Sequence, residues 1–150
     1  MLDYASPKEF SITDRRRGVG EHPHRGIETV TLAYQGEVEH RDSSGGGGVI
    51  KPGDVQWMTA GKGIVHDEVH SEEFSKKGGV FEMVQLWINL PKKHKMTNPK
   101  YQEISSGLIP TLSLGDNIKL RVIAGNFEET KGPSSTFTKV NLYDIISLSL

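Results

Sequence analysis

Glycine and proline divide this sequence into short segments, and this division limits its fold more than any other feature. The 150 residues include 17 glycines and 7 prolines. The stretches between them are rich in Val, Ile, Thr, Phe and Trp, and no long helical period runs through them. Short β-prone segments between turn signals are typical of an all-β sandwich or barrel. We therefore expect an all-β fold whose core a chain of this length can bury.

The expected strands follow from these segments. Strong strands are predicted at 27–34, 38–41, 49–50, 55–59, 64–70 and 80–90, and weaker ones at 101–104, 118–124 and 135–150. The segment 71–79 is predicted to be a polar loop. The charged connection 91–99 is the one place where a short helix fits.

The composition excludes several classes of function. Eighteen Lys and Arg residues stand against 19 Asp and Glu residues, so no overall field attracts nucleic acid or anionic lipid. The chain has no cysteine, which excludes disulfides, thiolate metal sites and thiol nucleophiles. The sequence shows no signal-peptide pattern and no run of eighteen apolar residues. We expect a cytoplasmic protein with no direct nucleic-acid or membrane partner.

Two pairs of possible metal ligands have the spacing of side chains that share one face of a strand. The stretch GVGEHPHRGIETVT contains His22 and His24, and GKGIVHDEVH contains His66 and Glu68. Three imidazoles and a carboxylate suit a divalent transition metal such as iron, manganese, nickel, copper or zinc. By spacing alone, Glu28 and His70 are equally possible ligands. A purely structural role for the histidines also stays open.

Side-chain alternation makes a further prediction about the inner face of the first strong strand. Counting in steps of two from His22 reaches Val30 and Leu32. If no bulge interrupts the register, these apolar residues mark the inner face. Thr29 and Thr31 then face solvent or a second sheet.

Three separate motifs of the chain resemble the pirin family of the cupin superfamily. They are HPHRGIETVT, PGDVQWMTAGKGIVHDE and QLWINLPKKHKMTNPKYQEI, in the family's order and spacing. The resemblance implies a cupin, which is a single small antiparallel jelly-roll β-barrel. It also implies one divalent ion, Fe²⁺ in that family, with His22, His24, His66 and Glu68 as its ligands. Because that family takes its carboxylate ligand from the second motif, Glu28 then becomes a pocket or structural residue. For the same reason, His70 is not expected to be a ligand.

The resemblance also bears on domains and assembly. Pirins are longer and carry a second cupin domain, so residues 1–139 are predicted to be the N-terminal cupin domain. Residues 140–150 would begin a truncated second domain or form an exchanged tail strand. Because open strand edges invite another chain, we expect a homodimer in which this apolar tail covers the interface. The alternative is a monomer whose tail folds back on its own barrel.

The resemblance suggests three functions. The first is a quercetin 2,3-dioxygenase, which opens the flavonol ring with molecular oxygen and releases carbon monoxide, with Glu68 as the base that takes the proton of the 3-hydroxyl. The second is an iron-binding regulatory protein that docks a transcription factor or a metabolic enzyme. The third is an inactive, truncated cupin. In all three, Gln56 is expected to pack beside the site.

Overall fold

The computed structural model describes residues 1–147 and divides the chain into two compact units, Met1–Ser105 and Ser106–Leu150. Nearly every element is a strand, and the sheets are antiparallel, which confirms the predicted all-β class. The predicted end of the cupin domain at residue 139 is a separate statement about domains, which this division into units does not test. It stays a prediction. No helix among residues 1–147 has the length and apolar character needed to cross a membrane.

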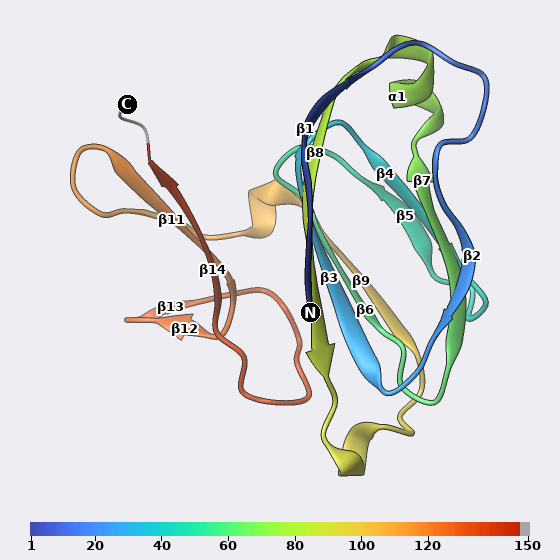
Figure 1. Cartoon of the computed structure of the whole chain (residues 1–150). Coiled ribbons are helices and arrows are strands. Elements are labelled where there is room, and N and C mark those ends of the chain that lie inside the picture. The colour runs from blue at the N-terminus through green and yellow to red at the C-terminus, as the bar shows by residue number, and fades with distance from the viewer. Residues whose placement is uncertain (148–150) are drawn as a thin grey trace. The chain divides into compact units, whose positions relative to one another are not determined.

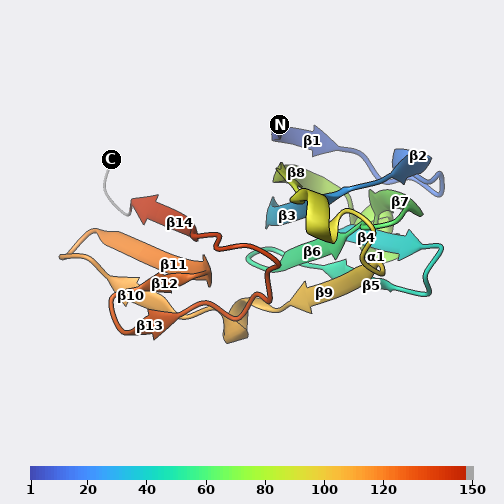
Figure 2. The same ribbon diagram turned by 90° about the horizontal axis from the view of Figure 1, so that it is seen from below.

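The first unit consists of two antiparallel sheets that lie as two layers (Figures 1 and 2). The five-stranded sheet has the order β1-β8-β3-β6-β9, and the four-stranded sheet has the order β2-β7-β4-β5. The strands of the first sheet are β1 (Leu2–Phe10), β8 (Gly79–Asn89), β3 (Ile27–Gln35), β6 (Val55–Thr59) and β9 (Lys100–Ile104). The strands of the second are β2 (Gly18–His24), β7 (Ile64–His70), β4 (Val38–Asp42) and β5 (Gly47–Ile50).

Two glycines permit the turns on either side of β3. Gly26 joins β2 to β3 with a φ of 69°, and Gly36 joins β3 to β4 with a φ of 76°. Both lie in the left-handed region that other residues rarely adopt. At Gly36 a Cβ atom would also lie 2.8 Å from the ring of Phe81, so only glycine fits there.

The short α-helix lies where the sequence analysis expected a loop. Helix α1 (Glu72–Lys77) begins at Ser71, whose hydroxyl accepts a hydrogen bond from the backbone N–H of Phe74. Acidic residues occupy its first turn and basic residues its last, which stabilises both ends. The segment 91–99 forms only the 3₁₀ turn η1 (Lys92–His94). Because α1 is so short, a cap and one buried side chain determine it, and no helical period reveals it.

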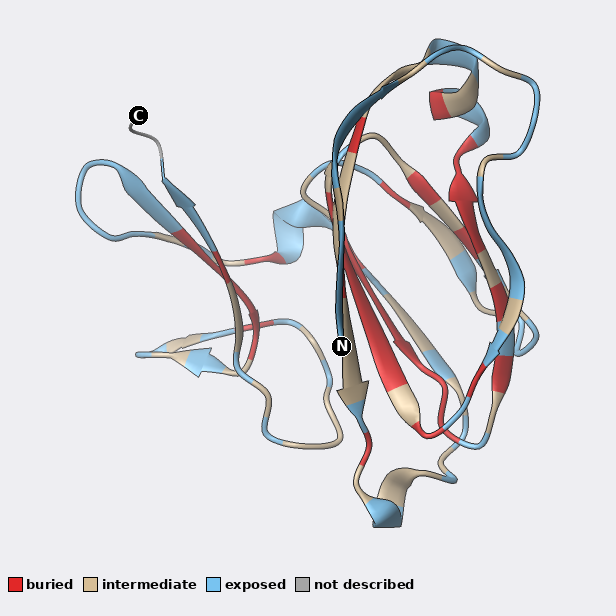
Figure 3. Ribbon diagram, in the orientation of Figure 1, coloured by how far each residue is buried: buried red, intermediate tan, exposed pale blue. Residues whose placement is uncertain are grey.

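The space between the layers is filled by two apolar clusters. One joins Ala33, Val38 and Ile50 to Phe74 and Phe81. The other consists of buried Met58, Ala60 and Ile64, with Ile27 and Tyr101 packed against them. Figure 3 shows that burial is strongest along β3, β6 and β7. Of the strands that carry candidate ligands, β7 is therefore well buried, whereas β2 is mostly exposed.

The second unit is a small sheet of order β10-β11-β14 with a two-stranded ribbon. Its elements are η2 (Ser106–Leu108), β10 (Thr111–Ser113), β11 (Ile118–Ala124), β12 (Asn126–Phe127), β13 (Thr130–Lys131) and β14 (Leu142–Ser147). The strand predicted at 135–150 is therefore shorter, and its last three residues lie outside the described part of the chain. β14 pairs with β11 of its own chain, the pairing of a tail that folds back. Exchange of this strand in a dimer stays a prediction.

Candidate metal centre

The candidate ligands come from two neighbouring strands of the four-stranded sheet. β2 carries His22 and His24, and β7 carries His66 and Glu68. The antiparallel pairing places His22 opposite His66. Since residues two apart on a strand share a face, this register gathers the three imidazoles at one place.

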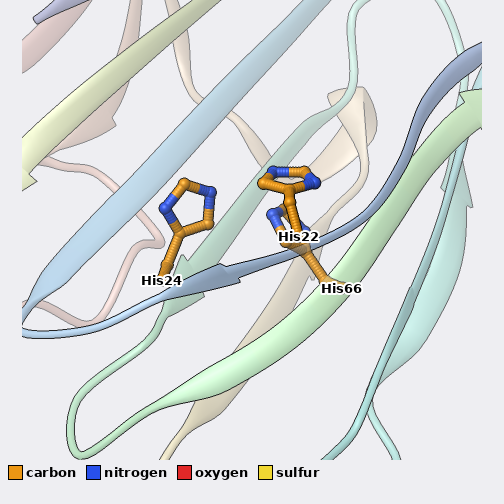
Figure 4. A group of neighbouring side chains, drawn as sticks. All are labelled: His22, His24 and His66. Atoms are coloured by element: carbon orange, nitrogen blue, oxygen red, sulfur yellow. The ribbon is translucent and has the colours of Figure 1, made fainter.

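The three histidine rings lie close to one another (Figure 4). The ring centroids are 4.8 Å apart for His22 and His24, 4.3 Å for His22 and His66, and 4.9 Å for His24 and His66. One nitrogen from each ring lies within 4.8 Å of the other two. Three nitrogen atoms at this spacing can reach a common metal ion.

The hydrogen bonding of the rings leaves nitrogen atoms available on each. Among residues 1–147, the Nε2 atoms of His24 and His66 are buried without a hydrogen-bond partner. The Nδ1 atom of His22 lies 2.8 Å from the carbonyl oxygen of Gly20, to which it can donate, so its Nε2 atom is left with a lone pair. Buried nitrogen without a partner is costly, and a divalent cation would satisfy all three atoms.

Two of the rings are held in the neutral state that binds metal. Burial lowers the pKa of His66 from 6.5 to about 3, and repulsion from His22, His40 and His24 adds to the effect. Burial also lowers the pKa of His24, with a contribution from His22. Because a ligating histidine must be deprotonated, both rings are prepared for a metal at neutral pH.

The structure places Glu68 differently from the three histidines. Its Oε2 atom accepts a hydrogen bond of 2.8 Å from Gln85, and its Oε1 atom accepts one from Gln56. Glu68 forms a second group of possible ligands with His66 and His40, apart from the group of His22 and His24. Of the four predicted ligands, three therefore meet directly, and Glu68 is linked to them through His66.

The other two candidates from the sequence lie outside both groups. Glu28 is fully buried and accepts a hydrogen bond of 2.7 Å from the hydroxyl of Thr59. His70 lies among aromatic rings, 4.7 Å from Phe10 and 4.6 Å from Phe81 between centroids. Neither belongs to a cluster of metal-binding atoms in the described part of the chain.

The predicted inner face of β3 is wrong. The Thr31 hydroxyl accepts a hydrogen bond of 3.0 Å from Gln85 on β8, and it lies 3.5 Å from Glu68 of the facing sheet. Thr31, rather than Val30, therefore points between the layers. The turn at Gly26 ends β2 and starts β3 anew, so the alternation does not carry across it.

Sequence reasoning missed His40 and Gln85, and it underestimated the role of Gln56. His40 is fully buried on β4, and its Nδ1 atom lies 3.2 Å from Nδ1 of His66. Gln56 donates a hydrogen bond to Glu68 rather than only packing beside the site, and Gln85 donates a second one. A signal for His40 was present, because His40 and Asp42 repeat the spacing of two that marks the ligand pairs.

A cavity of about 480 Å³ opens beside His22. Most of its wall is apolar, with Phe81, Met83 and Trp87 among the side chains. His22 and Glu68 supply polar atoms to the same cavity. This size, with a few polar groups in a mostly apolar wall, is typical of small-molecule sites.

Comparison with known proteins finds relatives along nearly the whole chain. The family model described as Pirin matches residues 1–88. A Pseudomonas aeruginosa protein named "Putative quercetin 2,3-dioxygenase PA2418" is 55% identical over 146 residues, which cover 97% of this chain and 51% of that protein. The chain thus spans about half the length of the curated relatives it matches.

Solved structures agree with the fold. A crystal structure of quercetin 2,3-dioxygenase from Acinetobacter baumannii matches with a TM-score of 0.93 and 59% identity, over 96% of this chain and 50% of that one. A crystal structure of bacterial pirin YhhW from Escherichia coli in complex with nickel(II) matches with a TM-score of 0.52 and 26% identity, over 73% of this chain and 51% of that one. These matches confirm the predicted cupin fold class.

Proposed function

We propose a metal-dependent function for this chain, which belongs to the pirin family. His22, His24, His66 and Glu68 would hold one divalent transition-metal ion, with Fe²⁺ as the physiological metal. The observation that carries the proposal is the pair of buried Nε2 atoms, on His24 and His66, that have no partner among the described residues. The nickel(II) bound by YhhW supports a first-row ion in this fold.

For the activity, we propose quercetin 2,3-dioxygenase chemistry with a flavonol and molecular oxygen as substrates. Relatives that carry this name and the apolar cavity support it. The bound metal would supply open coordination positions for the reactants. Glu68 would take the proton of the flavonol 3-hydroxyl at a carboxylate oxygen, while Gln56 and Gln85 hold that carboxylate in place. Phe81 and Trp87 would flank the flavonol and exclude water.

The test combines metal analysis with turnover of quercetin under air. Protein reconstituted with Fe²⁺ should bind one ion per chain and consume quercetin, whereas His22→Ala and His66→Ala should lose the metal. The matched control is His94→Gln, which removes a histidine in η1 and should change neither result. Full metal occupancy in both alanine variants would refute the proposed ligands.

Glu68→Gln separates the two roles of Glu68. As one ligand of four, its loss should weaken metal binding. As the base, its loss should abolish turnover even after the site is refilled, because an amide cannot take the proton. A variant that binds metal and oxidises quercetin at the wild-type rate would refute the role as base.

Family membership alone supports the second function, an iron-binding regulatory protein that docks a transcription factor or a metabolic enzyme. Metal-dependent binding of such a partner without turnover would favour it over the dioxygenase. Absence of both would favour the inactive cupin. All three are proposed for the cytoplasm, without direct contact to nucleic acid or membrane.

The homodimer is also a proposal, supported by the position of β14 at one edge of its sheet. Ile145 on this strand is 63% exposed, and an open edge can pair with a second chain. Light scattering should give a dimer mass that falls to the monomer mass when residues 141–150 are deleted. A monomer mass for both proteins would refute it.

A further inference from the structure

A line of buried polar contacts runs away from the candidate metal centre behind His66. Its Nδ1 atom lies 3.2 Å from Nδ1 of His40, and Nε2 of His40 lies 3.1 Å from Oδ2 of Asp42. The side chains of His40 and Asp42 are both fully buried. The pairing of β4 with β7 fixes this line, since it places Asp42 opposite His66.

The far end of this line is fixed by its own hydrogen bonds. The Oδ1 atom of Asp42 accepts hydrogen bonds from the backbone N–H and the hydroxyl of Ser44, at 2.8 and 2.6 Å, and from the N–H of Gly46 at 3.0 Å. These donors leave Oδ2 to face His40. The ring of His40 also stacks on Tyr101, with 4.7 Å between centroids and 14° between planes.

The partners determine where the protons lie. A carboxylate accepts only, so the Nε2 atom of His40 must carry a proton and donate it to Asp42. In a neutral ring the Nδ1 atom of His40 then has a lone pair, which can accept from Nδ1–H of His66. The Nε2 atom of His66 is thereby left without a proton, and it is the buried atom beside His22 and His24.

We infer that Asp42 and His40 are positioning residues that place the proton of His66 on Nδ1 and leave its Nε2 atom free to bind metal. This inference rests on the proposed metal site. Partners of this kind are general in metalloproteins, where they fix the ring and the tautomer of a ligating histidine.

Asp42→Asn should move the proton of each of the two rings, His40 and His66, to its other nitrogen atom. The substitution hardly changes the shape of the side chain. The amide oxygen is needed by the donors of Ser44 and Gly46, so the amide NH₂ would face Nε2 of His40. That atom must then accept, which moves the proton of His40 to Nδ1 and that of His66 to Nε2. Since the proton now occupies the metal-binding atom, we expect metal affinity to fall about 10- to 100-fold.

Substitutions at His40 test its role as the hydrogen-bond acceptor for Nδ1–H of His66. His40→Leu removes the acceptor for His66 and should weaken binding to a similar extent. His40→Asn keeps an oxygen near the place of Nδ1 and should restore most of the affinity. In the His40→Leu background, Asp42→Asn should cost less than about threefold, because it can no longer act on His66.

The experiment measures binding of Co²⁺ to metal-free protein by competition with a chelator, together with the Co²⁺ absorption spectrum. His70→Phe is the matched control and should keep the affinity. His70 is buried on β7 like His66, but it is not part of the line of contacts from His66 to Asp42. Circular dichroism checks that each variant is folded. Asp42→Asn has the shape of the native residue and keeps the test valid if His40→Leu does not fold.

Each outcome has a definite meaning. Wild-type affinity in Asp42→Asn and His40→Leu would overturn the inference while leaving the metal site intact. An equal cost of Asp42→Asn with and without His40 would also overturn it, because Asp42 would then act through its loop alone. Two ions per chain would place a metal, not a proton, between the two rings and would overturn it as well. Failure of the wild type to bind Co²⁺ would instead refute the proposed metal site.

Discussion

Burial of His66 should make the metal-free protein less stable in acid. The pKa of this histidine is about 3 in the folded chain because the ring is buried, whereas an unfolded chain has the ordinary value of 6.5. As the pH falls below 6.5, the unfolded state binds a proton that the folded state does not. The contribution of His66 to stability is therefore complete above pH 6.5 and falls by about 1.4 kcal/mol per pH unit until the pH nears 3.

The two values give a measurable difference between pH 7 and pH 5. Over this interval His66 should remove about 2 kcal/mol from the free energy of unfolding. The assay is urea unfolding in a chelator, followed by tryptophan fluorescence, since Trp57 and Trp87 both lie in the first unit. The loss should be about 2 kcal/mol smaller in His66→Gln, whereas His94→Gln should behave as the wild type. Equal losses in wild type and His66→Gln would refute the reasoning.

Four further predictions concern stability. Metal at 100 times its Kd should raise the free energy of unfolding by about 2.7 kcal/mol at pH 7, measured by the same unfolding assay. Gly36→Ala should cost at least 1–3 kcal/mol, because the left-handed backbone and the ring of Phe81 both oppose a Cβ atom; a change below 0.5 kcal/mol would contradict this. Met58→Ala should cost about 2–5 kcal/mol by leaving a cavity in the core, read from the urea midpoint. Asp144→Asn should destabilise the second unit by breaking its buried 3.0 Å ion pair with Arg121, visible as faster hydrogen exchange in β11 and β14.

The strands were predictable where they depend on local signals. The predictions 55–59 and 64–70 coincide with β6 and β7, and 27–34 differs from β3 by one residue. Each lies between turn residues, and 27–34 and 55–59 are rich in β-branched or aromatic residues. Such runs fix a strand without help from the rest of the chain.

The sequence did not predict which face of a sheet each side chain occupies, because this depends on pairing with strands far away in the sequence. The turn at Gly26 separates the alternation of β2 from that of β3, so Thr31 faces Gln85 and Glu68. His40 reaches the site only through the pairing of β4 with β7. Single-strand spacing identifies which side chains share a face, but only the sheet register shows which faces meet.

In the metal-free chain, the buried histidine cluster stabilises the fold less than apolar side chains at the same positions would. Two buried Nε2 atoms, on His24 and His66, lack a partner among the described residues, and each such atom costs about 1–3 kcal/mol. Burial also makes the pKa of His66 a source of acid lability. A leucine or phenylalanine at position 66 would avoid both costs, and one at position 24 would remove the unpartnered Nε2 atom there. Because the atoms that destabilise the metal-free chain are those that would bind the cation, a bound metal would offset the cost of burying them.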